Sequence, residues 1–345
     1  MAYYDGLFDL LGLRDWCDQA AGAGTTSMKD LLLAGKGGGS ASGFWQTPFP
    51  SLDALNKSCA QIGRTRDLTN SIESGFLAAK DSLKVVLDPL TQPLSWLLNG
   101  AVSGLSAVPW FLFIPACLLL VWLISRAVGV TLFVAFVLCL LAFIDHYTYA
   151  VETLAIIFVC AGLSVVIGVP LGILMSKSDA FQRGMTPVLD MLQTLPAFVY
   201  LIPLIFLFSV TEPKLYGIAI ILYAIVPIIR LTDLGLRVVD PEIIEAANAF
   251  GMTPLQRLRE VELPLAMPNI MAGMNQTIMM SLSMVVIASL VSAPGLGVLV
   301  LRGINNLELG TGLVAGLGIV LLAIVLDRVS KAAVRCSSGT RGDAS

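Results

Sequence analysis

A polar segment between two apolar runs holds the residue spacing that most restricts what this chain can do. Glu245-Ala246-Ala247 is followed after three residues by Gly251, and nine further residues lead to Val261-Glu262-Leu263-Pro264. The two small alanines allow another backbone to approach closely, and the glycine permits a sharp corner. Because a short bare turn is enough to connect two helices, we expect this longer, shaped segment to dock onto a second protein.

Start and stop signals divide the segment into two short helices. Asp240 and Pro241 are typical of a helix start, and Gly251 is typical of a helix end because glycine readily adopts the left-handed conformation. Thr253 is the expected cap of a second helix, which we expect Pro264 to end. Exposed charges are expected along that second helix, at Arg257, Arg259, Glu260 and Glu262.

The residue patterns of common enzymes are missing from the sequence. It contains no GxxxxGKS or GxxxxGKT phosphate-binding loop, so ATP hydrolysis by that route is not expected. His146 is the only histidine and has no partner spaced for metal binding or catalysis, and the six cysteines show no CxxC spacing. We therefore expect no catalytic residue, no metal site and no cofactor held by this chain.

The composition is that of a membrane protein. Of the 345 residues, 56% are hydrophobic and 13% are charged, and the mean hydropathy is +0.84, whereas soluble proteins carry about 25% charged residues. The net charge of −3 argues against nucleic acid as a partner. Several apolar runs after residue 108 approach the ~20 residues that a helix needs to cross a bilayer, so the lipid bilayer is the expected environment.

The expected fold is all-α and integral to the membrane, with about seven transmembrane helices. A polar extracytoplasmic tail is expected over residues 1–84 and an amphipathic interfacial helix over 85–107. The transmembrane domain is expected over 108–335, with its two-helix cytoplasmic loop at 240–264, and a cytoplasmic tail over 336–345. The seven spans are expected near 108–126, 128–144, 149–175, 194–211, 214–236, 267–291 and 308–327.

The distribution of Lys and Arg predicts the orientation of these spans. Eleven Lys and Arg lie in segments on one side of the predicted spans, and only Lys214 and Arg302 lie in short loops on the other. Since cytoplasmic loops carry the excess of positive charge, we expect the 240–264 loop and the C-terminus in the cytoplasm and the N-terminus outside. An outside tail would permit a disulfide between Cys17 and Cys59, although their spacing alone does not decide it.

The polar segment resembles the cytoplasmic loop motif of permease subunits of ABC importers. That motif is Glu-Ala-Ala, three residues, Gly, nine residues, an aliphatic residue, one residue and Leu-Pro, and this chain differs in having Val261 where isoleucine is usual. The resemblance covers roughly residues 85–335 and includes the segments 192–197 and 294–297. Within the family, the chain most resembles permeases for glycine betaine and proline betaine, which are osmoprotective solutes.

The resemblance implies a set of partners and a location. Two copies of the permease would form the pore in the bacterial inner (plasma) membrane, and an extracytoplasmic substrate-binding protein would deliver the cargo. Each loop would sit in a groove of a separate ATP-binding subunit, which would hold the ATP and Mg. The implied ATPase-coupling residues are Glu245, Ala246, Ala247, Gly251, Leu263 and Pro264.

A path for a quaternary-ammonium solute needs aromatic faces and polar contacts. Aromatic rings attract such cations by about 0.5–2 kcal/mol each, and Phe198, Tyr200 and Tyr223 lie in central spans. Polar contacts are expected from Gln193, Asn275 and Gln276, because polar groups inside a membrane usually face the bundle interior. For each of these residues, ordinary helix packing is the competing interpretation.

Other functions remain open at the level of sequence. Choline, carnitine or trimethylamine N-oxide would suit the same architecture. An ion-driven secondary transporter usually shows buried ionisable residues, and here Glu152 and Asp233 are the nearest candidates, both near predicted span ends. The turn at residues 294–297 is either a contact for the binding protein or a plain connection. A membrane enzyme is disfavoured because no triad, metal set or carboxylate pair is present.

Overall fold

The computed structural model describes residues 12, 49, 51–59 and 62–339, and these residues are helical with no β-strand among them. The chain forms two compact units, Met1–Leu83 and Lys84–Ser345. The helical architecture confirms the all-α fold expected from the sequence.

The described part of the first unit consists of α4 (Leu52–Ser58) and the beginning of α5 (Thr65–Ala107). Cys59 is buried between the two helices, where apolar side chains pack against it. Its expected partner Cys17 lies outside the described residues, so the pairing stays a prediction.

α5 is one continuous helix of 43 residues, and the predicted boundary between a polar tail and an interfacial helix at 84/85 falls inside it. The part of α5 that belongs to the second unit is tied to α11 (Pro213–Arg237). The Lys214 ammonium lies 2.6 Å from Asp88 Oδ1, and Leu98, which is fully buried, packs where Gly217 leaves room for it.

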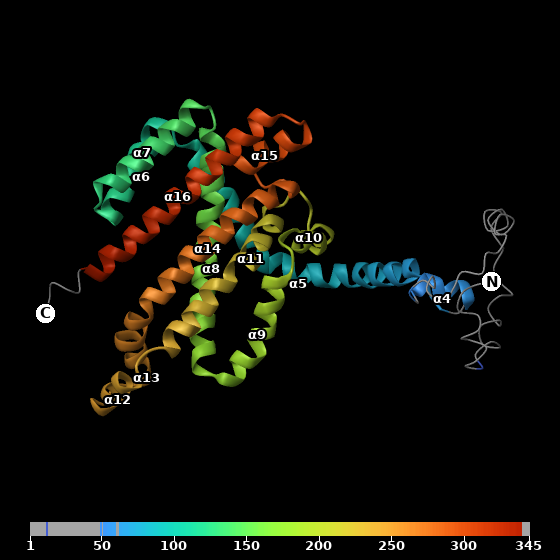
Figure 1. The fold of residues 1–345 in the computed structure, drawn as a ribbon, viewed down its shortest axis with the longest axis horizontal. Helices are drawn as coiled ribbons and strands as arrows, with labels where there is room; N and C mark the ends of the chain where they lie inside the picture. Colours follow the sequence, from blue (N-terminus) through green and yellow to red (C-terminus); the bar gives the residue numbers. More distant parts are fainter. Residues whose placement is uncertain (1–11, 13–48, 50, 60–61, 340–345) are drawn as a thin grey trace. The chain divides into compact units, whose positions relative to one another are not determined.

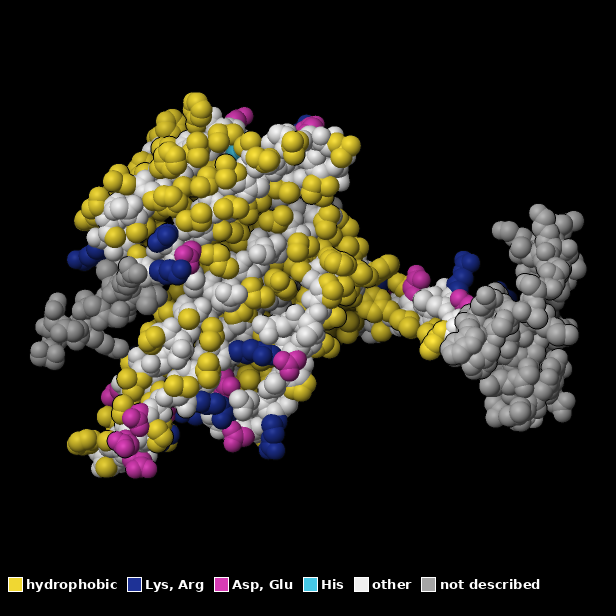
Figure 2. Space-filling model, viewed as in Figure 1, with side chains coloured by type: hydrophobic (Ala, Val, Ile, Leu, Met, Phe, Trp, Pro, Cys, Tyr) yellow, Lys and Arg dark blue, Asp and Glu magenta, His cyan; other side chains and the backbone are white. Residues whose placement is uncertain are grey.

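Long helices alternate with short ones in the rest of the second unit (Figure 1). In chain order they are α6 (Trp110–Ser125), α7 (Val128–Phe143), α8 (Tyr147–Lys177), α9 (Asp179–Thr194), the 3-10 helix η3 (Ala197–Tyr200), α10 (Leu201–Leu207), α11, α12 (Pro241–Ala249), α13 (Pro254–Gln256), the π-helical η4 (Arg257–Glu262), α14 (Leu263–Ala288), the 3-10 helix η5 (Ser289–Val291), α15 (Leu296–Asn305) and α16 (Leu309–Gly339). The outer surfaces of α6, α7 and α16 are covered by hydrophobic side chains, as a lipid-facing surface requires (Figure 2).

The number of membrane spans differs from the expected seven. Four helices of the described part are long and apolar enough to cross a bilayer, and up to six spans result if each of two bent helix pairs counts as one. α6 and α7 have 16 residues each, which is about 24 Å of helix and falls short of the roughly 30 Å hydrocarbon layer. The membrane-spanning helical fold is confirmed, whereas the count of seven is not.

The span expected at 194–211 is wrong, because the helix there covers only Ala197–Leu207 and reaches membrane length only together with α9. α9 and the following segment Ala197–Leu207 meet at an angle of 108°. The break has a local cause, because Pro196 disfavours the helical conformation of the residue before it, and Leu195 is extended with φ −67° and ψ 131°. α9 itself falls in a stretch that the span prediction leaves unassigned.

Glycines bring the three central helices α8, α11 and α14 into close contact. A Cβ added to Gly172 of α8 would lie 2.7 Å from the Ile229 carbonyl oxygen of α11, and one added to Gly273 of α14 would lie 3.1 Å from Ile228 Cα. Membrane helices that approach this closely gain van der Waals contact and depend on small residues at the interface. These three helices therefore form a tightly packed block.

We expect Gly172→Ala to destabilise this block by about 1–3 kcal/mol, because the new methyl group collides with backbone that must move. Thermal unfolding of the purified protein in detergent measures the effect. Gly162→Ala on the same helix is the matched control, since no atom lies within 4 Å of its added Cβ. Equal melting temperatures for the two variants would contradict the close packing of α8 on α11.

Candidate functional site

The two short helices of the polar segment begin at the caps that the sequence indicates. Asp240 Oδ1 accepts a hydrogen bond from the Glu242 N–H at 2.9 Å. Thr253 and Gln256 form a complete capping box, in which each side chain accepts a hydrogen bond from the backbone N–H of the other residue. Side-chain caps of this kind stabilise a helix start by about 1 kcal/mol, so the segment holds its shape without a partner.

The corner between the helices is built on Gly251, as expected. This residue has φ +76°, a conformation that costs other residues roughly 1–2 kcal/mol. Its N–H donates to the Asn248 carbonyl at 2.9 Å, and the Met252 N–H donates to the Ala247 carbonyl at 3.2 Å. These two bonds are the Schellman pattern that satisfies the last carbonyls of a helix.

The expectation that Pro264 ends the second helix is wrong. α13, η4, α14 and η5 run on as one helical segment, Pro254–Val291, and Pro264 lies in the first turn of α14. In a regular α-helix the proline ring would clash with the carbonyl four residues earlier. Here the six preceding residues are π-helical, and the wider turn with its i→i+5 bonds lets the helix pass through the proline.

The end of the segment is apolar and exposed. Phe250 at the corner is 85% exposed and Leu255 is 73% exposed, whereas Ala247 is only 4% exposed because α12 packs on η4. Of the coupling residues expected on α12, Glu245 and Ala246 are exposed, and the neighbouring Ile243 is exposed as well. Acidic side chains surround this end (Figure 2), so its hydrophobic residues form a small apolar patch with an acidic rim.

A buried carboxylate joins this segment to the membrane helices. Glu262 of η4 is 2% exposed, and its Oε1 accepts a hydrogen bond from Arg257 Nε at 2.9 Å. Its other oxygen, Oε2, accepts a hydrogen bond from the Lys177 ammonium at the end of α8. Arg257 also donates to the Asn248 side chain of α12 at 2.8 Å. The chain of bonds therefore runs from α12 through Glu262 to α8.

The expected exposed position of Glu262 is wrong, and the reason lies in the helix type. Positions five apart do not face each other on an α-helix, so the sequence does not suggest that Arg257 and Glu262 pair. The π-helical turn of η4 brings them together. Lys177 lies 85 residues from Glu262 in sequence, and no local pattern indicates this contact.

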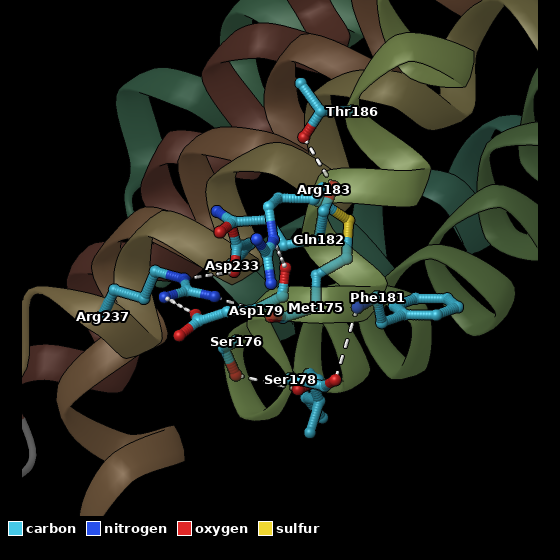
Figure 3. A network of polar contacts seen from close by, with 11 residues as sticks. Met175, Ser176, Ser178, Asp179, Phe181, Gln182, Arg183, Thr186, Asp233 and Arg237 are labelled. Atoms are coloured by element: carbon cyan, nitrogen blue, oxygen red, sulfur yellow. Dashed lines mark hydrogen bonds and ion pairs between the residues drawn. The ribbon is translucent and has the colours of Figure 1, made fainter.

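A second polar network fixes the end of α11, the helix that precedes the polar segment (Figure 3). Asp233 of α11 accepts hydrogen bonds from Arg237 Nε at 2.9 Å and from the Gln182 amide at 2.8 Å. The Arg237 guanidinium also donates to Asp179 Oδ1 at 2.9 Å and to the Met175 carbonyl at 2.8 Å. The end of α11 is thereby fastened to the corner between α8 and α9, and Asp233 is fully engaged as a structural partner.

Four of the expected substrate-path residues lie around the break between α9 and α10. The rings of Tyr200 and Tyr223 meet edge to face with centroids 6.3 Å apart, and the Tyr200 hydroxyl donates to the Leu192 carbonyl. Gln193 and Phe198 are exposed. η3 and α10 contact α14 and α11 respectively, so this group lies beside the central block.

The two expected path residues on α14 behave differently from each other. Asn275 is held in a network with α16, in which its amide donates to Asp327 Oδ1 at 3.0 Å and its oxygen accepts from the Ser330 hydroxyl at 2.8 Å. Gln276 is exposed. The structure therefore assigns Asn275 a role in joining α14 to α16, while Gln276 is available to a solute.

The turn at residues 294–297 packs inward. Leu296 is fully buried, and its N–H donates to Thr153 Oγ1 of α8 at 2.9 Å. Gly295 has φ +115°, and a Cβ there would lie 2.4 Å from the same oxygen. The turn therefore fixes α15 against α8. This packing explains the glycine at position 295 without a partner protein.

Comparison with known proteins gives these features a context. The family described as "Binding-protein-dependent transport system inner membrane component" matches residues 164–335. The glycine betaine/proline betaine transport system permease protein ProW of Escherichia coli (strain K12) is 40% identical over 309 residues, which cover 89% of this chain and 86% of that protein. The glycine betaine transport system permease protein OpuAB of Bacillus subtilis (strain 168) is 41% identical over 258 residues, covering 74% and 90%.

A third relative extends the range of named solutes. The glycine betaine/carnitine transport permease protein GbuB of Listeria monocytogenes serotype 1/2a (strain 10403S) is 44% identical over 205 residues, which cover 59% of this chain and 72% of that protein. The residues matched by the family, 164–335, include both polar networks and the two short helices.

We expect Glu262→Gln to loosen α12 and η4, because Arg257 and Lys177 lose their shared anion and the cost of an unmet charged hydrogen bond is about 1–3 kcal/mol. Hydrogen–deuterium exchange should rise in residues 241–262 and stay unchanged in α16. Glu260→Gln, which removes an exposed carboxylate from the same helical segment, is the control. Unchanged exchange in Glu262→Gln would show that the buried carboxylate does not hold the segment.

Proposed function

Because this chain belongs to the family of binding-protein-dependent transport system inner membrane components, and to its glycine betaine permeases, we infer that it is the permease subunit of an ATP-driven importer of a quaternary-ammonium solute. The similarity to ProW over 309 residues carries this inference. The capped, rigid corner of α12 and α13 supports it, because an importer permease needs a shaped surface for its ATPase.

The proposed ATPase contact is the exposed end of the polar segment. Phe250, Leu255 and Ile243 supply an apolar patch that a groove of the ATPase would cover. Gly251 sets the corner, and the bonds of Glu262 carry a push on α12 into α8. The residues assigned to coupling are Glu245, Ala246, Ala247, Gly251, Leu263 and Pro264, and the ATP and Mg would lie on the partner ATPase.

The remaining partners follow from the same family assignment. A second copy of the chain would complete the pore, and an extracytoplasmic substrate-binding protein would supply the solute. We place the protein in the inner membrane with the 240–264 segment and the C-terminus in the cytoplasm, on the basis of the Lys and Arg distribution. The N-terminus is proposed to lie outside, which requires an odd number of spans. Residues 1–84 would form an outside tail, 85–107 an interfacial helix, 108–335 the permease domain and 336–345 a cytoplasmic tail.

The proposed cargo is glycine betaine or proline betaine. The faces of Phe198 and Tyr223 suit a methylated ammonium, while Tyr200 is buried and supports Tyr223 from behind. Gln193 and Gln276 are exposed polar groups that suit the carboxylate. Carnitine is the second candidate because one relative is named for it. Choline and trimethylamine N-oxide share the ammonium or amine-oxide chemistry and belong in the same test.

Reconstitution tests the proposal directly. The chain is incorporated into vesicles with its ATPase and binding protein, and uptake of labelled glycine betaine is followed with and without ATP. Uptake should require ATP and both partners, and unlabelled carnitine, choline or trimethylamine N-oxide should compete according to the specificity of the complex. Uptake by the chain alone, driven by an ion gradient, would instead establish a secondary transporter.

We expect Phe250→Ser to weaken the ATPase contact by about 2 kcal/mol, or roughly 30-fold, because an aromatic anchor at the centre of the patch is lost. Co-purification with the ATPase and ATP-dependent uptake measure the loss. Leu307→Ser removes an equally exposed side chain, 91% exposed between α15 and α16, and should leave both readouts unchanged. Normal ATPase binding by Phe250→Ser would contradict the assignment of this patch.

A further inference from the structure

An apolar groove opens between the helices that flank the central block. One cavity of about 510 Å³ is lined by residues of α5, α6, α7, α8 and α16. A second cavity of about 310 Å³ continues it between α8, α14 and α16, and Phe158 and Leu326 line both. The two cavities therefore adjoin along α8 and α16, and together we call them the groove.

The walls of this groove offer no hydrogen-bond partner stronger than the Cys117 thiol. An extended peptide would leave its N–H and C=O groups unpaired against such walls. A hydrocarbon chain needs no polar partner and fills an irregular apolar groove well. The surface around the groove is also apolar, since two of its lining residues, Leu120 and Phe158, are exposed.

One end of the groove is positively charged. Ile124 and Val329 line that end, and Arg126 follows two residues after the first, while Arg328 adjoins the second. α6 and α16 pack together there. Both arginines are exposed, and within the described residues neither forms an ion pair.

The nearby acidic residue, Asp327, interacts electrostatically with Arg328, but its strongest partners are other groups. Asp327 bonds to Lys331 at 2.8 Å and to the Asn275 amide at 3.0 Å, so its charge is met by its own partners. Arg126 and Arg328 belong to the side of the membrane that the Lys and Arg distribution assigns to the cytoplasm. Anionic headgroups of that leaflet attract basic residues at a helix end by about 1 kcal/mol each.

We propose that this groove binds an anionic phospholipid, with one acyl chain between α6, α8 and α16 and the phosphate at Arg126 and Arg328. The lipid would fill the space between the central block and the flanking helices α6 and α7. This site is independent of the cargo and of the ATPase contact, so a test of lipid binding does not depend on the proposed transport function.

Lipid retention by the purified full-length chain tests the headgroup contact. Native mass spectrometry compares retention of phosphatidylglycerol and phosphatidylcholine by the wild type and by Arg126→Gln and Arg328→Gln. Each substitution should lower the preference for phosphatidylglycerol about fivefold. Arg302→Gln removes an exposed arginine from the opposite side of the predicted spans and should leave the preference unchanged. An unaltered preference in the Arg126→Gln, Arg328→Gln double variant would overturn the proposal.

A second pair of variants tests the acyl-chain groove. Leu120→Trp fills the groove and should abolish retention of the bound lipid, whereas Leu119→Trp makes the same change at the adjacent exposed position of α6, which does not line it. Equal lipid retention by the two variants would contradict the site. A photo-crosslinker at position 120 should label lipid in membranes, and labelling of a protein chain instead would overturn the lipid assignment.

Discussion

The buried carboxylate of Glu262 is the contact on which the arrangement of the polar segment 240–264 depends. An anion that is 2% exposed at the base of a membrane helix is costly unless cations and hydrogen-bond donors surround it. Arg257 and Lys177 meet that requirement from two different helices. The carboxylate therefore keeps α12, η4 and α8 in one relative arrangement, because separating any of them exposes an unmet charge.

The close packing of the central helices extends the constraint set by Glu262 from α8 to α11. α8 is pressed against α11 at Gly168 and Gly172, where an added methyl group would overlap existing atoms. The Asp233 and Arg237 network then fastens the end of α11 to the α8–α9 corner. Both ends of the polar segment are consequently attached to the same corner, so a displacement of α12 would act on α8 and α11 together.

The sequence predicts the local features well and the distant contacts poorly. The Asp240 cap, the Gly251 corner and the Thr253 capping box depend on residues within a few positions, and all three are present. The bond from Lys177 to Glu262 joins residues 85 positions apart, and periodicity carries no information about it. Span prediction failed at 194–211 for a related reason: hydropathy registers apolar length, whereas the membrane-length segment here also includes α9, which Pro196 acting on Leu195 sets at 108° to Ala197–Leu207.

The continuity of the helix through Pro264 determines what a push from a partner can do. If the helix ended at Pro264, a flexible joint would absorb motion of the corner before it reached the membrane. Instead, Pro254–Val291 is a single helical segment of 38 residues, so a motion at its polar end would be transmitted to the central block. The π-helical η4 is the least regular part of that segment, and π-turns are frequent at functional sites. A change in its hydrogen-bond register, with Glu262 as the fixed point, would rotate α12 relative to α14 without breaking the helix.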